Sequence, residues 1–239
     1  MIYFTGDTHG SIEKLTYFVK KHALSDNDII VVLGDAGFNY YGNTHGDAHI
    51  KKKVNQLGVT VFCIHGNHEQ RPEAISSYSI SSWRGGAVFV EQDYPNLLFA
   101  KDGEVYDLDG HKALVLGGAY SVDKYYRLLK GYHWFENEQP DEEIKAHAAA
   151  SLEKLDWKID TVLSHTCPYK YIPREAFLPG IDQTLVDNST EIWLDTIEDK
   201  LIYKQWLCGH WHIDKQIDKI RFLMDDFISL TEITNDSKK

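Results

Sequence analysis

The sequence predicts an α/β protein. Short apolar runs rich in β-branched residues are typical of buried strands, and they occur at 1–4, 28–33, 59–64, 161–163 and 203–207. Helix-forming stretches separate most of these runs, and polar side chains gather just after each run ends. This alternation favours sheets whose strands are joined by helices and whose active site lies beyond the carboxyl ends of the strands.

The helical stretches are indicated by spacing and composition. Ser11 can cap a helix whose apolar residues recur at helical spacing, namely Ile12, Leu15, Phe18 and Val19. A polar helix is expected over 45–57, and a stretch dominated by Ala, Glu, Lys and Leu predicts another over 141–155. The pattern of a capping box at 188–191 predicts a further helix that ends near residue 200.

Between residues 87 and 118 the pattern changes to short strands. Turn signals separate them at Pro95-Asn96, Asp102-Gly103 and Asp109-Gly110. These signals predict antiparallel hairpins, and hairpins between two α/β halves indicate a mixed sheet packed on a second sheet. Since no linker rich in Pro, Gly or Ser divides the 239 residues, we expect one domain over 1–233 and a disordered tail at 234–239.

Composition limits the class of partner. The formal net charge of −11 argues against a broad basic surface for nucleic acid but leaves a small phosphorylated substrate or a phosphoprotein open. The cysteines at 63, 167 and 208 have no paired spacing, so we expect reduced core residues. With no apolar stretch of membrane-spanning length and no leader pattern, we expect a cytoplasmic protein without membrane contact. Nothing in the sequence indicates an oligomeric state.

The polar residues after the strands repeat a pattern. Asp7 and His9 stand two residues apart on an extended backbone, so their carboxylate and imidazole leave the same face and can form half of a metal site. Further groups follow the other predicted strands: Gly-Asp at 34–35, Gly-Asn-His-Glu at 66–69, Ser-His at 164–165 and Gly-His-Trp-His at 209–212. Because ligands gather at the carboxyl ends of strands in open α/β sheets, these groups are expected to converge.

In this order the motifs resemble those of the calcineurin-like metallophosphoesterases. The resemblance runs from Asp7 to His212 and so covers nearly the whole chain. It implies a two-sheet, mixed β-sandwich flanked by helices, with four layers in the order αββα.

The resemblance also implies two divalent metal ions. The first would be held by Asp7, His9, Asp35 and His212. The second would be held by Asp35, Asn67, His165 and His210, with the Asp35 carboxylate bridging the ions. The positive charge of two such ions exceeds the negative charge of the two carboxylates. The site can therefore lower the pKa of a bound water to give hydroxide, and it can attract phosphate. Oxygen and nitrogen ligands without Cys suit Mn, Fe, Zn or Ni, with Mn favoured.

Three further side chains are candidates for catalysis or substrate binding. By resemblance, His68 would act with Asp35 and protonate the leaving group, although a role in orienting a ligand is the alternative. Arg71 could bind phosphate oxygens through its planar guanidinium, or lie solvated before Pro72. Arg127 could face phosphate from the aromatic and basic stretch 120–139, which otherwise packs only on itself.

Gly-Asp-Thr-His-Gly at 6–10 and Gly-Asn-His-Glu at 66–69 look most like the serine/threonine phosphatase branch, but the second motif, Gly-Asp at 34–35, departs from it. That branch has an Asp and an Arg after the bridging Asp, and Phe38 and Asn39 hold these places here. An Asp that would orient His68, and one phosphate-binding Arg, are therefore missing there. Gly-His-Trp-His is closer to the phosphodiesterase and nuclease branches, so both monoesters and diesters stay open as substrates.

Three functions are consistent with these residues. The first is hydrolysis of phosphate mono- or diesters, for example nucleotides or phosphoproteins, by attack of a metal-bound hydroxide. The second is a nuclease of the same superfamily, which the acidic charge disfavours. The third is a non-catalytic interaction module with the same fold, which retention of all seven implied ligands and His68 makes the weakest.

Overall fold

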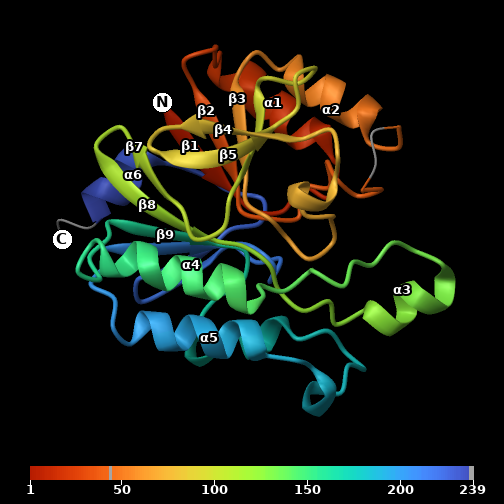
Figure 1. Ribbon diagram of the computed structural model, residues 1–239, viewed down its shortest axis with the longest axis vertical. Helices are drawn as coiled ribbons and strands as arrows, with labels where there is room; N and C mark the ends of the chain where they lie inside the picture. Colours follow the sequence, from red (N-terminus) through yellow and green to blue (C-terminus); the bar gives the residue numbers. More distant parts are fainter. Residues whose placement is uncertain (43–44, 237–239) are drawn as a thin grey trace.

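The computed structural model describes residues 1–42 and 45–236, which form a layered α/β sandwich (Figure 1). The strands in these residues form two mixed sheets, with the orders β13-β1-β2-β3-β6-β5-β4 and β11-β12-β10-β9-β8-β7. The strands are β1 (Ile2–Thr5), β2 (Ile29–Val32), β3 (Thr60–Cys63), β4 (Ser79–Trp83), β5 (Gly86–Val90), β6 (Leu97–Ala100), β7 (Val105–Leu108), β8 (His111–Leu116), β9 (Thr161–Ser164), β10 (Gln205–Cys208), β11 (Lys215–Ile217), β12 (Ile220–Phe222) and β13 (Phe227–Ser229).

Parallel strands form the centre of each sheet. In the first sheet β1, β2, β3 and β6 run parallel, and in the second β8, β9, β10 and β12 do so. Most of their residues are buried, as expected for parallel strands covered on both faces. The carboxyl ends of β1, β2 and β3 therefore lie along one edge of the first sheet, and those of β9 and β10 along one edge of the second.

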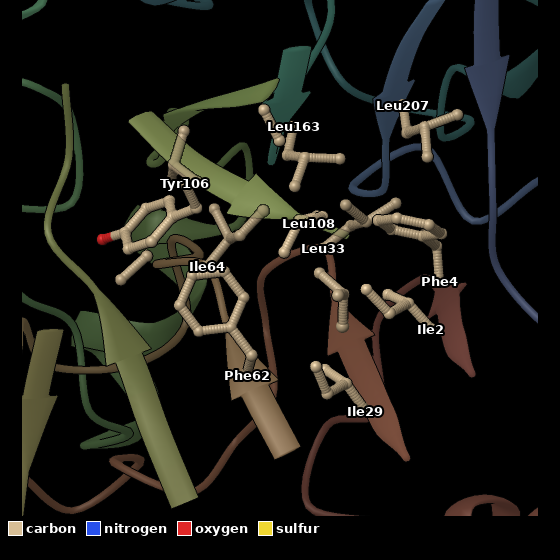
Figure 2. Close-up of a cluster of buried hydrophobic side chains, with 14 of the residues drawn as sticks. Ile2, Phe4, Ile29, Leu33, Phe62, Ile64, Tyr106, Leu108, Leu163 and Leu207 are labelled. Carbon is tan, nitrogen blue, oxygen red and sulfur yellow. The ribbon is translucent and has the colours of Figure 1, made fainter. Parts of the chain in front are cut away.

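The main core lies between the two sheets. Figure 2 shows side chains of the first sheet meeting those of the second, among them Ile2, Phe4, Ile29, Leu33, Phe62, Ile64, Tyr106, Leu108, Leu163 and Leu207. The one polar atom that Tyr106 brings into this core is satisfied, because its hydroxyl donates to the Ala87 carbonyl and accepts from the backbone N–H of Lys101. The sheets are thus joined by apolar packing.

Helices cover the outer face of each sheet. Apolar residues of α1 (Ile12–His22) and α2 (Ala48–Asn55) pack on the first sheet, and those of α4 (Glu142–Glu153) and α5 (Ser189–Glu198) pack on the second. Figure 1 shows the resulting order of helices, sheet, sheet and helices. The predicted αββα architecture is confirmed. Helix α3 (Lys124–Lys130) lies out beyond the sandwich.

The region predicted to form hairpins belongs to both sheets. β7 and β8 are joined by Asp109 and Gly110, whose φ angles of 56° and 83° suit a tight hairpin turn. β4, β5 and β6 are antiparallel neighbours in the other sheet. β6 then pairs in parallel with β3, which the turn signals did not predict.

Three expectations about element ends are wrong. Ser11 precedes α1, but its side chain makes no capping bond in the described structure, and its hydroxyl donates to the Glu13 carboxylate instead. Asn188 precedes α5, but its side chain makes no capping bond in the described structure; the Asp187 carboxylate accepts from the N–H of Ser189 instead, while Glu191 bonds Thr166. Helix α6 (Leu230–Asp236) contains residues 234–236 of the expected disordered tail, because Ile233 packs into the core. Residues 237–239 lie outside the described residues.

The remaining short elements are 3₁₀ turns, at Pro72–Ala74, Tyr169–Tyr171, Arg174–Ala176 and Gln183–Leu185. Cys63, Cys167 and Cys208 are buried thiols, in agreement with their predicted place in the core. Within the described residues, we find no helix with the length and apolar character needed to cross a bilayer.

Candidate metal centre

The predicted metal ligands lie on short turns that follow the strands. Four of them have a left-handed backbone, with φ of 45° at His9, 45° at Asp35, 65° at His210 and 51° at His212. This conformation is uncommon for residues other than glycine and costs of order 1–3 kcal/mol each. Such strained residues cluster at functional sites, where the surrounding structure holds them in place.

Asp7, His9 and His212 form the first half of the cluster. The Nε2 atoms of His9 and His212 are 3.0 Å apart. Asp7 Oδ2 lies 3.2 Å from His212 Nε2 and 3.7 Å from His9 Nε2. The other carboxylate oxygen of Asp7 accepts the backbone N–H of His210 at 3.0 Å, which fixes the orientation of the carboxylate.

Asn67, His165 and His210 form the second half. Asn67 Oδ1 lies 2.8 Å from His165 Nε2 and 3.0 Å from His210 Nδ1. His165 Nδ1 donates to the Leu33 carbonyl oxygen at 2.9 Å, so in the neutral ring Nε2 is the unprotonated nitrogen that faces the cluster. Burial, followed by the neighbouring His165, lowers the pKa of His210 to about 3, so this ring is neutral at physiological pH.

The Asp35 carboxylate lies between the two halves. Its Oδ1 is 3.6 Å from His165 Nε2, and its Oδ2 is 3.9 Å from His9 Nδ1. Burial raises the pKa of Asp35, but the nearby imidazoles of His165, His68 and His9 lower it by more than burial raises it. The net pKa is therefore below its usual value. The carboxylate is therefore ionised, as a bridging ligand must be.

Two glycines of the motifs make room for these carboxylates. A Cβ atom on Gly66 would lie 2.0 Å from Asp35 Oδ1, and one on Gly209 would lie 2.3 Å from Asp7 Oδ1. Any other residue at either position would push the carboxylate away. The glycines that precede Asn67 and His210 are thus part of the site.

This donor set fits divalent cations. Asp7 Oδ2 is buried and has no hydrogen-bond partner among the described residues. A buried carboxylate oxygen that accepts no hydrogen bond is unfavourable, and a cation would satisfy it more fully than the nearby imidazole of His212 does. The ring nitrogens of His9 and His212 lie 3.0 Å apart, close enough for both to bind one ion together with the Asp7 carboxylate. Possible ligand atoms of Asp7, Asp35 and His165 also lie within 4.8 Å of one another.

His68 lies beside the cluster and has a carboxylate on each side. Its Nδ1 is 3.3 Å from Asp35 Oδ2, and its Nε2 is 3.3 Å from Asp123 Oδ1. Burial lowers the pKa of His68, but Asp35 and Asp123 outweigh burial and raise the net pKa above its usual value. The sequence analysis did not identify Asp123 as a partner of His68. The available sequence signal was the position of Asp123 beyond the carboxyl end of β8, just before the helical residues 124–130.

Of the two candidate arginines, the structure brings only Arg127 to the cluster. Arg127 lines a cavity with His9 and His68, and its Nε donates to the Asp123 carboxylate at 2.9 Å. Arg71 is buried rather than solvated: its guanidinium pairs with Asp102 and donates to the Asn137 carbonyl at 2.7 Å. The expected place of Arg71 among phosphate-facing groups is therefore not found.

Two cavities adjoin the cluster, and Asp35 and His68 line both. One, of about 620 Å³, carries Tyr40, Tyr41, Tyr132 and Arg127. The other, of about 340 Å³, carries Tyr120, Phe177, Leu178 and Trp211. A larger cavity, of about 1210 Å³, is lined by Arg71, Asp102 and other residues outside the cluster. Predicted metal ligands line the two smaller cavities, which makes these cavities the candidates for substrate binding.

Comparisons with known proteins agree with this geometry. No curated protein matches the sequence. One solved structure superposes with a TM-score of 0.54 at 15% identity over 97% of this chain and 95% of its own. The crystal structure of TT1561 of Thermus thermophilus superposes with a TM-score of 0.51 at 14% identity, over 93% of this chain and 87% of its own. These likenesses support the fold alone. The family model for calcineurin-like phosphoesterases matches residues 1–214, and the chain belongs to that family.

Proposed function

We propose that this protein hydrolyses phosphate mono- or diesters at a two-metal centre, with His68 as the general acid. The family implies metal-dependent phosphoester hydrolysis. The observation that carries the proposal is the convergence of the seven predicted ligands from five separate turns, with the Asp35 carboxylate between two groups of donors.

The chain's own residues have distinct tasks in this proposal. Bound divalent ions would supply an activated water and would polarise the phosphate oxygens. Asp7, His9, Asp35 and His212 would hold one ion, and Asp35, Asn67, His165 and His210 would hold the other. His68 Nδ1 faces Asp35 and the cluster, where it can donate a proton to the departing oxygen. Arg127 lines the neighbouring cavity, where its guanidinium can bind a phosphate oxygen.

The surroundings favour a small phosphorylated substrate, a nucleotide or a phosphorylated protein side chain. Tyrosines line one cavity beside His68, and Phe177 and Trp211 line the other, so each can accept an apolar or aromatic part of the ester. Manganese is the favoured metal, since the oxygen and nitrogen donors suit it. We place the protein in the cytoplasm.

Hydrolysis assays test the proposal. Chromogenic monoesters and diesters are incubated with the protein and Mn²⁺, with and without a chelator, and in the His68→Ala variant. We expect hydrolysis that the chelator abolishes and that His68→Ala lowers by about 100-fold or more. Protein that binds two ions tightly and hydrolyses neither class of ester would refute the proposal and support an interaction module. Nucleotides, cyclic nucleotides, phosphopeptides and single-stranded DNA then identify the substrate class.

A further inference from the structure

We propose that residues 120–139 are a positioning element of the active site, in which Ser121 orients the ligand Asn67 and Asp123 orients His68. The inference rests on the proposed phosphoesterase function. It assigns a role to a segment whose aromatic and basic composition left its purpose open.

The Ser121 hydroxyl holds the end of the Asn67 amide that faces away from the cluster. Asn67 Nδ2 donates to Ser121 Oγ at 2.9 Å, and Ser121 is buried. With the NH₂ group held there, Oδ1 is turned toward His165 and His210. Only the oxygen of an amide can bind a cation, so the bond from Asn67 Nδ2 to Ser121 supports the orientation that binds metal.

Ser121 is in turn fixed by the far end of the segment. Its backbone N–H donates to Glu138 Oε1 at 3.2 Å, and the indole N–H of Trp134 donates to Glu138 Oε2 at 2.7 Å. Glu138 is buried, so both bonds are shielded from water. The two ends of the segment are thereby tied together beside the metal centre.

Asp123 orients His68 from the same segment. Its Oδ1 lies 3.3 Å from His68 Nε2, and Arg127 Nε donates to both of its carboxylate oxygens at 2.9 Å. A carboxylate that accepts the Nε2–H keeps the ring in one orientation, with Nδ1 toward Asp35 and the cluster. Arg127 keeps the carboxylate itself in place.

The residues that follow Asp35 in sequence cannot perform this task. Phe38 is fully buried in the apolar core, and Asn39 Oδ1 accepts the Tyr78 hydroxyl at 3.0 Å. The carboxylate at His68 therefore comes from a distant part of the chain. Simple self-packing does not explain the segment, because Tyr125, Tyr126 and Tyr132 are 72%, 54% and 52% exposed.

Metal affinity tests the Ser121 contact without any assay of activity. We measure Mn²⁺ binding by isothermal titration calorimetry in wild type, Ser121→Ala and Trp134→Phe, with folding checked by circular dichroism. Ser121→Ala should raise the dissociation constant by about 10- to 100-fold, the usual effect of losing such a partner. Trp134→Phe should raise it less. Ser189→Ala is the control, because its hydroxyl bonds Gln139 and not Asn67. Unchanged binding in folded Ser121→Ala would overturn this role.

Leaving-group dependence tests the Asp123 contact. A general acid matters most for a poor leaving group, so Asp123→Ala should lower kcat at least about tenfold for an alkyl ester and much less for a 4-nitrophenyl ester. KM should stay unchanged, and Asp123→Asn should recover part of kcat because Asn still offers an acceptor. Asp182→Ala is the control, since the hydrogen bonds of that carboxylate in the described part of the chain stay within its own turn.

The following outcomes separate this inference from its alternatives. In a His68→Ala background, Asp123→Ala should cause no further loss of kcat, because both changes remove the same function. Equal losses on both esters, a change in KM alone, or an additive loss would each overturn the role of Asp123. If the wild type binds metal but hydrolyses no ester, the proposed function fails, whereas the effect of Ser121→Ala on metal binding still decides the role of Ser121.

Discussion

The Asp35 carboxylate contacts both the backbone and the side chain of His68. Asp35 Oδ1 accepts the backbone N–H of His68 at 2.8 Å, and Asp35 Oδ2 lies 3.3 Å from His68 Nδ1. Since Asp35 also lies between the two halves of the metal cluster, any shift of this carboxylate moves the proposed bridging ligand and the proposed acid together. The geometry of the acid is thereby coupled to that of the metal site.

Asp35→Asn should weaken both metal sites. Asn keeps the oxygen that accepts the His68 N–H and suits the left-handed backbone, so the main change is the loss of charge. Because Asp35 is proposed to bind both ions, both dissociation constants should rise by more than the roughly 10- to 100-fold typical of an outer-shell change. Elemental analysis after dialysis against limited metal measures this.

The matched control for that variant is Asp109→Asn. Asp109 has a similar φ of 56° but is an exposed turn residue paired with Arg84. It should retain both ions. If Asp35→Asn also retains two ions per chain under the same dialysis, Asp35 does not bridge them.

Gly209→Ala should damage the first metal site without a change in any ligand. The added Cβ would lie 2.3 Å from Asp7 Oδ1 and 2.8 Å from the Leu33 carbonyl oxygen, so the Asp7 carboxylate must move. We expect at least a tenfold loss of affinity for one ion, by analogy with outer-shell changes. Calorimetric titration with Mn²⁺ measures it.

Gly110→Ala provides the comparison for Gly209→Ala. No heavy atom of the described structure lies within 4 Å of a Cβ at Gly110, although its φ of 83° makes alanine strained there. This variant should lose stability and keep both metal affinities. A Gly209→Ala protein that binds metal as tightly as Gly110→Ala would show that Asp7 can relax without cost.

The convergence of the proposed metal ligands could be predicted from the sequence because each motif directly follows a strand. Asp7, Asp35 and His165 are each within three residues of a short apolar run, so local pattern places them at strand ends. Asp123 also lies beyond the carboxyl end of a strand, but its contact with His68 could not be found from that position alone. Its role depends on how residues 120–139 fold back from β8 to the turn after β3, and no local spacing encodes that path.

Arg71 shows the same limit, because here the sequence position favoured a contact that the structure does not form. Its position near His68 in sequence favoured a phosphate contact, but its side chain turns to the buried Asp102 on the loop between β6 and β7. That partner is far away in sequence, and its Oδ1 also accepts the Gly117 N–H. Tertiary pairing therefore decided where this arginine points.

Arg71→Met should lower stability rather than substrate affinity. The change leaves the Asp102 carboxylate buried without its cation, which typically costs about 3–5 kcal/mol. Arg84→Met, which breaks the partly exposed pair with Asp109, should cost about 1 kcal/mol or less. Urea unfolding of both variants measures the difference. A raised KM with unchanged stability in Arg71→Met would instead return Arg71 to the substrate site.

Glu191 should make stability depend on pH. Burial raises the pKa of its carboxyl from 4.5 to about 7, although the Thr166 hydroxyl donates to Oε1 at 2.8 Å and opposes the shift. The native state therefore holds the proton of Glu191 more tightly than the unfolded state does. The contribution of Glu191 to the free energy of unfolding is fully present below pH 4.5 and is lost as the pH rises to about 7, a change of about 3 kcal/mol.

Glu191→Gln removes this titration and keeps an oxygen that can accept the Thr166 hydroxyl. The stability of the variant relative to wild type should therefore increase between pH 4.5 and 7 and stay constant above that range. Urea unfolding at several pH values, with chelator present so that no ion contributes, measures the difference. Glu142→Gln on the exposed face of α4 should follow the wild-type profile, because that side chain is 90% exposed. A constant difference between Glu191→Gln and wild type from pH 4.5 to 8 would mean that Glu191 is ionised in the native protein despite its burial.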